Sequence, residues 1–178
     1  IVGLDHRAEE IKRGADRHYP VMKVDDLYAA IRVECPAGLQ LGGLWNGYFF
    51  MWTTSNHEPD AHYLGGLLRL RYVTDFVWVK ARSTDGRMQT HTGLGQYRRS
   101  CHERLLMFVA GRPPMPESAY PRSVMFSWPT RHSEKPAEQY DIAEHIGGAS
   151  AKKIELFARS SRRGWDAWGN QELLASAP

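Results

Sequence analysis

The chain has 178 residues, of which 42% are hydrophobic and 24% are charged, and its formal net charge is +3. This length and apolar content suit one globular domain, so we expect a single domain over residues 1–178. The mildly basic balance permits a nucleic-acid partner without requiring one. Two cysteines and the lack of an apolar run of about 20 residues argue against structural zinc and a transmembrane helix, and we expect a soluble, cytoplasmic protein.

The first half of the chain predicts two helices and two strands. Apolar residues at helical spacing predict a helix over 24–34. The aromatic run 48–53 is bounded by turn residues and is typical of a buried strand. Pro59 can open a second helix, and the apolar run 72–79 predicts the next strand. The order is therefore strand, helix, strand.

The second half adds strands and one more helix. The apolar runs 105–109 and 123–127 predict strands, and the proline-rich segment 113–116 between them must be a loop. A helix is expected over 136–145 and a strand over 153–157. Buried strands that alternate with helices indicate an α/β fold with a mostly parallel sheet and helices on both faces. Such sheets bind ligands beyond the carboxyl ends of their strands.

The last predicted strand carries charges on one face only. Alternate side chains of a strand point to opposite faces, so Glu155, Phe157 and Arg159 share one face. Burying an unpaired charge is costly. We therefore expect Glu155 and Arg159 either to pair with each other or to meet a polar ligand near the end of the strand.

Three further groups of polar residues are candidates for binding. Lys135 precedes a proline-started helix, where it can reach an anionic ligand, although on this segment alone we favour a solvated lysine. The segment 97–99, Tyr-Arg-Arg, suits a phosphate backbone and a stacked base, and a solvated basic loop explains it equally well. His91, His102 and Glu103 lack the spacing of a metal site, so no metal is expected.

Several segments resemble, in the same order, the METTL-type (MT-A) N6-adenine methyltransferases, including their bacterial and phage DNA relatives. The resemblance covers nearly the whole chain from His18 to Gln171, and its most specific part is 153–171. The matching segments are 18–22, 49–55, 72–80, the group Gly95, Arg98, His102 and Glu103, then 111–113, 132–136 and 153–171.

The resemblance implies a Rossmann-like methyltransferase fold and S-adenosylmethionine as the cofactor. It places Lys135 at the methionine carboxylate, and it places Glu155 and the backbone near Leu156 and Phe157 along the site. The ribose and adenosine part would meet the remaining cofactor residues, which are Arg159, Asn170 and Gln171. Lysine matches a carboxylate, and arginine and amides offer forked hydrogen bonds to hydroxyls.

The activity implied by the resemblance is methyl transfer to the N6 amine of adenine in nucleic acid. We favour DNA over RNA because the chain is compact and has no added RNA-binding domain. Tyr19, Arg98 and His102 are the expected substrate-binding residues. No membrane partner is expected, and a homo- or heterodimer is compatible with the sequence.

One motif of the family is missing. Its members hold the target amine with an Asp-Pro-Pro-Trp motif after an apolar strand, and this sequence contains none, so no catalytic residue is assigned. Either residues are missing from this sequence near Val2 and Gly3, or the chain is a noncatalytic subunit that binds nucleic acid or an active partner. We favour missing residues, because Ile1 and Val2 look like the end of a strand. A Rossmann-like domain for another nucleotide is a third hypothesis.

Overall fold

The computed structural model describes residues 22–33, 46–93, 97–116, 120–130, 134–158 and 161–168. All the predicted helices and strands that fall in these ranges are present, and β3 and β7 were not predicted. None of the described helices is both long and apolar enough to cross a membrane. In chain order the elements are α1 (Val24–Val33), β1 (Gly47–Thr53), α2 (Glu58–Leu67), β2 (Arg71–Thr84), β3 (Arg87–Thr90), β4 (His102–Ala110), β5 (Val124–Ser127), α3 (Glu138–Gly147), β6 (Ile154–Leu156) and β7 (Asp166–Trp168).

The main sheet is mostly antiparallel, so the expectation of a mostly parallel sheet was wrong. Its strand order is β1-β4-β2-β3, and β5 also pairs with β2. Strand β4 runs antiparallel to both β1 and β2, β3 runs antiparallel to β2, and among these described strands only β5 joins in parallel. The apolar run of β4 misled the prediction, because a strand covered on both faces is apolar whatever its direction.

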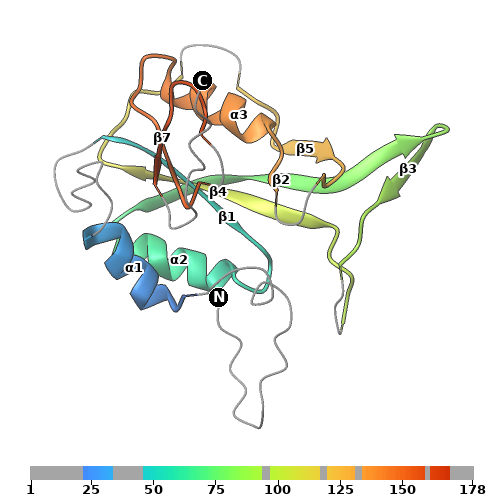
Figure 1. Cartoon of the computed structure of the whole chain (residues 1–178), viewed down its shortest axis with the longest axis horizontal. Helices are drawn as coiled ribbons and strands as arrows, with labels where there is room; N and C mark the ends of the chain where they lie inside the picture. The colour runs from blue at the N-terminus through green and yellow to red at the C-terminus, as the bar shows by residue number, and fades with distance from the viewer. Residues whose placement is uncertain are drawn as a thin grey trace, which may run out of the picture.

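Helices cover both faces of the main sheet, as expected. Figure 1 shows α1 and α2 below the sheet and α3 above it. The side chains of β4 alternate between these layers: Leu106 and Phe108 pack with α1 and α2, whereas Leu105 and Met107 pack with α3. Alternate side chains of β4 therefore belong to two hydrophobic cores, one on each face of the main sheet.

An arginine fastens α2 to the sheet on the α1 and α2 side. Arg104 of β4 donates through Nε to Asp75 of β2 at 2.9 Å, and its other end pairs with Glu58 at the start of α2. The hydrogen bond from Arg104 lowers the pKa of Asp75, despite the opposing effect of burial. These three partly buried side chains join two strands and a helix.

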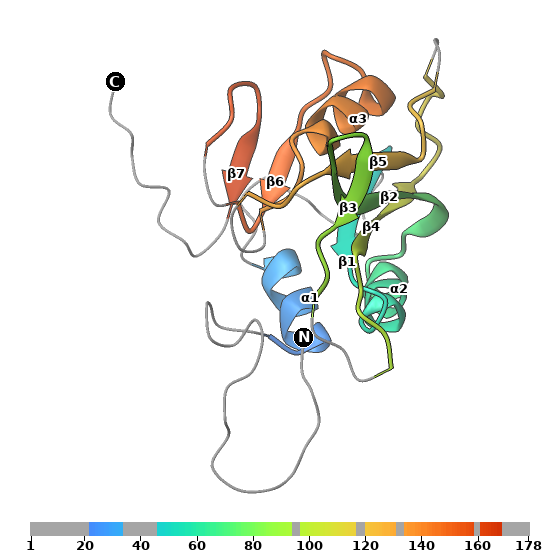
Figure 2. The same ribbon diagram turned by 90° about the vertical axis from the view of Figure 1, so that its right-hand side faces the viewer.

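Strands β6 and β7 form a separate parallel pair beside the main sheet. Figure 2 shows them next to α3. Trp165, just before β7, donates through Nε1 to Glu144 of α3 at 2.7 Å and packs edge-on against Tyr140 of the same helix. Helix α3 therefore connects the small sheet to the main one.

Candidate functional site

A cavity of about 960 Å³ lies between β1 of the main sheet and β6 of the small sheet. Its remaining walls come from α1, α2 and α3, with smaller contributions from β4, β7 and the loop residues Pro113 and Pro114. Consecutive residues of both strands line it, from Tyr48 to Thr53 and from Lys153 to Phe157. Because a strand face would contribute only alternate residues, the edges of β1 and β6 border this space.

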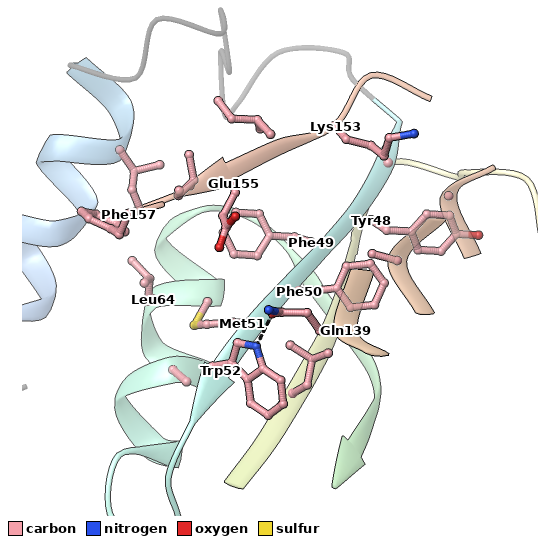
Figure 3. Close-up of a pocket in the computed structure, with 18 of the residues that line it drawn as sticks. Tyr48, Phe49, Phe50, Met51, Trp52, Leu64, Gln139, Lys153, Glu155 and Phe157 are labelled. Carbon is pink, nitrogen blue, oxygen red and sulfur yellow. Dashed lines mark hydrogen bonds between the residues drawn. The ribbon is translucent and has the colours of Figure 1, made fainter. Parts of the chain in front are cut away.

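Glu155 is the acidic group that β6 presents to the cavity. Figure 3 shows its carboxylate pointing from β6 towards Phe49 of β1. Its Oε2 accepts a 2.9 Å hydrogen bond from the hydroxyl of Tyr140. Burial, followed by the Glu155 carboxylate, raises the pKa of Tyr140 to about 12, so the phenol stays a neutral donor. Within the described residues, Oε1 has no hydrogen-bond partner, which leaves it able to accept one from a ligand.

The end of β6 differs from the expectation. The strand covers Ile154–Leu156 rather than 153–157, and it is half-buried rather than buried. Phe157 adopts a φ of 60°, which breaks the alternation, so the expected common face of Glu155 and Phe157 does not exist. The Phe157 ring packs edge-on against Trp168 at 5.1 Å and remains 41% exposed. A left-handed residue at the strand end thus exposes an aromatic ring beside the cavity.

Lys135 belongs to a charged cluster on the α3 side of the main sheet. The cluster consists of Glu103, Lys80 and Lys135. One carboxylate oxygen of Glu103 accepts a 2.6 Å hydrogen bond from Lys80, and the other oxygen accepts one from Lys135. Burial raises the pKa of Glu103, but the two ammonium groups outweigh it and the pKa lies below its usual value. Lys135 is therefore paired and partly buried, not simply solvated.

Two tryptophans form the floor of this cluster. The Lys135 ammonium lies 5.5 Å from the centre of the Trp52 ring, and the Lys80 ammonium lies 5.1 Å from that of Trp78. Trp52 also lines the cavity and donates to Gln139 of α3 at 2.6 Å, the bond dashed in Figure 3. Lys135 is not itself part of the cavity lining, and it is linked to the cavity through Trp52.

The other expected site residues are placed as follows. Tyr19, Arg159, Asn170 and Gln171 lie outside the described residues. Of the cofactor set, Glu155, Leu156 and Phe157 come together along the cavity wall. The two described substrate-binding candidates lie elsewhere: Arg98 is exposed in the segment between β3 and β4, and His102 is half-buried at the start of β4.

Sequence reasoning missed Lys80, Tyr140 and Trp52 as members of the site. Lys80 follows Trp78 by two residues and so shares its face, which was a usable signal. Its partner Glu103 lies 23 residues further on, in another strand. The pairing of Tyr140 with Glu155 likewise joins a helix to a strand. Such contacts depend on the tertiary arrangement and have no local sequence pattern.

Comparison with known families matches residues 39–171 to MT-A70. The chain belongs to the MT-A70 family. It is also 36% identical over 122 residues to the type II methyltransferase M.MunI of a Mycoplasma species, a match that covers 67% of this chain and 48% of that protein. The chain thus spans about half the length of this relative. These findings confirm the resemblance seen in the sequence, and MT-A70 membership implies a Rossmann-like fold.

The MT-A70 match includes the described site residues except the cavity wall formed by α1. Residues 39–171 contain the cavity wall at β6 and the cluster of Lys80, Glu103 and Lys135. They also include all five described strands of the main sheet, from β1 to β5. Apart from the α1 wall, the part of the chain that carries the candidate site is therefore the part that the family shares.

Proposed function

We propose that this MT-A70 chain is an S-adenosylmethionine-dependent methyltransferase that modifies the N6 amine of adenine in nucleic acid, with DNA favoured over RNA. The observation that supports it most is the half-buried Glu155, held by Tyr140 at the rim of a large cavity in a chain of this family. The similarity to a type II methyltransferase also supports this class of activity.

The cavity wall has the chemistry that this cofactor requires. Ligand cavities are mostly apolar with a few placed polar groups, and a volume of about 960 Å³ lies within their usual range. Oε1 of Glu155, which has no hydrogen-bond partner among the described residues, can accept hydrogen bonds from ribose hydroxyls, and the exposed ring of Phe157 offers an aromatic surface to a purine. When bound, S-adenosylmethionine supplies an electrophilic methyl group.

The charged cluster suits the carboxylate end of the same molecule. Lys135 has three donor hydrogens, so it can keep its bond to Glu103 and bind a second carboxylate. Two lysines oppose a single glutamate, which leaves the cluster one positive charge in excess. We propose that Lys135 binds the methionine carboxylate, while Glu155, Leu156 and Phe157 contact the nucleoside. The outlying cofactor residues Arg159, Asn170 and Gln171 stay predictions.

Other side chains hold these groups in place. The Tyr140 hydroxyl fixes the Glu155 carboxylate, and the guanidinium of Arg162 lies 4.1 Å above the Tyr140 ring. The ion pair with Glu103 fixes the Lys135 ammonium in direction. We infer that this arrangement prepares the site before the cofactor arrives, which reduces the ordering cost of binding.

Calorimetry with S-adenosylhomocysteine tests the cofactor assignment. Glu155→Gln keeps the side-chain volume and removes the charge that would accept from the ribose, so the affinity should fall about 10-fold or more. Glu138→Gln is the matched control, because Glu138 is exposed and does not line the cavity. If Glu155→Gln binds as tightly as the control, the assignment of Glu155 is wrong.

Methyl transfer itself is tested with labelled cofactor and adenine-containing DNA and RNA oligonucleotides, followed by nucleoside analysis. We expect N6-methyladenine, with more product on DNA. The alternative function is a noncatalytic subunit that binds nucleic acid or an active partner, which would account for the absence of Asp-Pro-Pro-Trp from this sequence without missing residues. Nucleic-acid binding without transfer by the full-length protein would support that alternative. Reading the coding sequence around Val2 for the motif separates the two hypotheses independently.

A further inference from the structure

Strand β2 extends beyond the main sheet and forms a ribbon with β3. Its pairing with β4 ends at Val79, and the residues from Ala81 to Thr84 pair with β3. Figure 1 shows this ribbon projecting from the body of the molecule. The two-residue turn Asp85 and Gly86 has φ values of 51° and 72°, as the tight turns of rigid hairpins require. All residues from 82 to 93 are exposed.

The ribbon has one basic face. The register places Arg82 opposite Gln89 and Thr84 opposite Arg87, and residues that face each other across a pair share a side. Both arginines therefore lie on the same face with a threonine and a glutamine. The other face carries no charge, and its residues are Ala81, Ser83, Met88 and Thr90.

The two arginines of this face have no acidic partner. Within the described part of the chain, neither Arg82 nor Arg87 forms an ion pair, whereas Arg104 pairs with two carboxylates. The Arg82 guanidinium lies 4.3 Å from the centre of the Trp128 ring, and its Nε is 3.5 Å from Oε1 of Gln89. Arg82 is thus oriented by an aromatic ring while its charge stays available to a partner.

The basic face continues towards the candidate site. Trp78, Lys80 and Arg82 alternate along β2 and so lie on one side of it, the side that carries the cluster of Lys80, Glu103 and Lys135. The exposed Arg98 and Arg99 add positive charge on the chain that returns from β3 to β4. Positive charge therefore extends along the ribbon to the site, with Asp85 of the turn as the one acidic residue from 81 to 90.

We propose that the β2 and β3 ribbon binds double-stranded DNA, with its basic face in the major groove. This inference rests on the proposed function in taking nucleic acid as the substrate. The major groove of B-form DNA admits a two-stranded ribbon, whereas the deep, narrow major groove of A-form RNA does not. Arginine and glutamine, present here as Arg87 and Gln89, are side chains that pair with guanine and adenine edges in that groove. Arg82 contacts phosphate.

Fluorescence anisotropy with a duplex DNA oligonucleotide at several salt concentrations tests the proposal. The ribbon variant is Arg82→Gln with Arg87→Gln. The matched control is Arg69→Gln with Arg71→Gln, which removes the same charge from exposed positions at the opposite end of β2. The ribbon variant should bind at least about 10-fold more weakly, and its slope of log K against log salt should fall by about 2. The control should change both quantities much less.

Three results of the binding experiment would overturn the ribbon proposal. Equal losses in the ribbon and control variants would mean that only net charge matters, and absence of duplex binding by the parent protein would mean that the ribbon has another partner. Equal affinity for duplex RNA would refute the groove assignment. Circular dichroism melting checks that both variants fold.

The failure of this proposal and that of the proposed function can be distinguished. If ribbon-dependent binding occurs without methyl transfer, only the proposed function fails. If both variants methylate DNA like the parent protein, only the ribbon proposal fails.

Discussion

Replacing Glu103 with glutamine should destabilise the protein and expose the role of the charged cluster. The substitution keeps the shape of the side chain but leaves Lys80 and Lys135 facing each other without a counter-charge. Removing one partner of a buried ion pair costs about 3–5 kcal/mol. The Glu103 side chain is only 11% exposed, but those of Lys80 and Lys135 are 21% and 25% exposed, so solvent screens part of the effect. We expect a loss of about 2 kcal/mol.

Urea unfolding measures this loss. With a slope of about 2 kcal/mol per molar, the midpoint of Glu103→Gln should fall by about 1 M. Glu138→Gln removes an exposed carboxylate and should change stability by less than about 0.5 kcal/mol. In a double-mutant cycle with Lys135→Met, the coupling energy should be about 1–2 kcal/mol. A coupling energy near zero would refute the pairing.

The pH dependence of unfolding gives an independent check. The folded-state pKa of Glu103 lies below its ordinary value of 4.5, so the native state binds a proton less readily than the unfolded state. The stabilisation by Glu103 is therefore fully present above the unfolded-state pKa and is lost as the pH falls through the folded-state pKa. The Glu103→Gln variant should lose less stability than the parent on acidification below about pH 4.5. Identical acid profiles would contradict the reasoning.

Two further predictions concern the helices. A Cβ on Gly65 would lie 2.6 Å from Cε1 of Phe108, so Gly65→Ala should cost about 1–3 kcal/mol in urea unfolding. Gly66 has open space around it, so Gly66→Ala should be neutral or stabilising by up to about 1 kcal/mol. Equal effects of the two substitutions would contradict the close packing of α2. Tyr140→Phe should cost about 1 kcal/mol, because it removes the bond to Glu155. The folded-state pKa of Tyr140 is about 12, against an ordinary value of 10.0. The stabilisation by Tyr140 is therefore full below pH 10 and is lost as the pH rises through 12. The Tyr140→Phe variant should lose less stability in alkali than the parent protein, and identical alkaline profiles would refute the prediction.

The sequence predicted elements well where a local pattern specifies them. Apolar spacing located α1, and the aromatic run 48–53 located β1. Helix α3 begins at Glu138, two residues later than expected, because Pro136 and Ala137 form a turn whose carbonyls accept from the residues three positions later. Strand β3 was missed because its four residues are exposed and only Met88 is apolar, although the Asp-Gly turn before it was a usable hairpin signal.

The sequence offered candidate site residues but did not indicate their contacts. A half-buried carboxylate on β6 needs a partner, and Glu155 was selected on that argument. Its partner is Tyr140, which lies 15 residues earlier in α3, and nothing local to either residue indicates the pair. Lys135 was a candidate for an anion, and the structure adds Glu103 as its neighbour.

By itself, the sequence determined the helices and most strands and the MT-A70 resemblance, and it offered Lys135 and Glu155 as candidate site residues, because these depend on residue type and short-range spacing. Only the tertiary structure decided the strand directions, the pairing of Glu103 with two lysines, and the projection of the β2 and β3 ribbon. An apolar strand is compatible with either direction, and an ion pair between distant segments forms only when the fold brings them together. Local chemistry selects the elements, and long-range packing selects their partners.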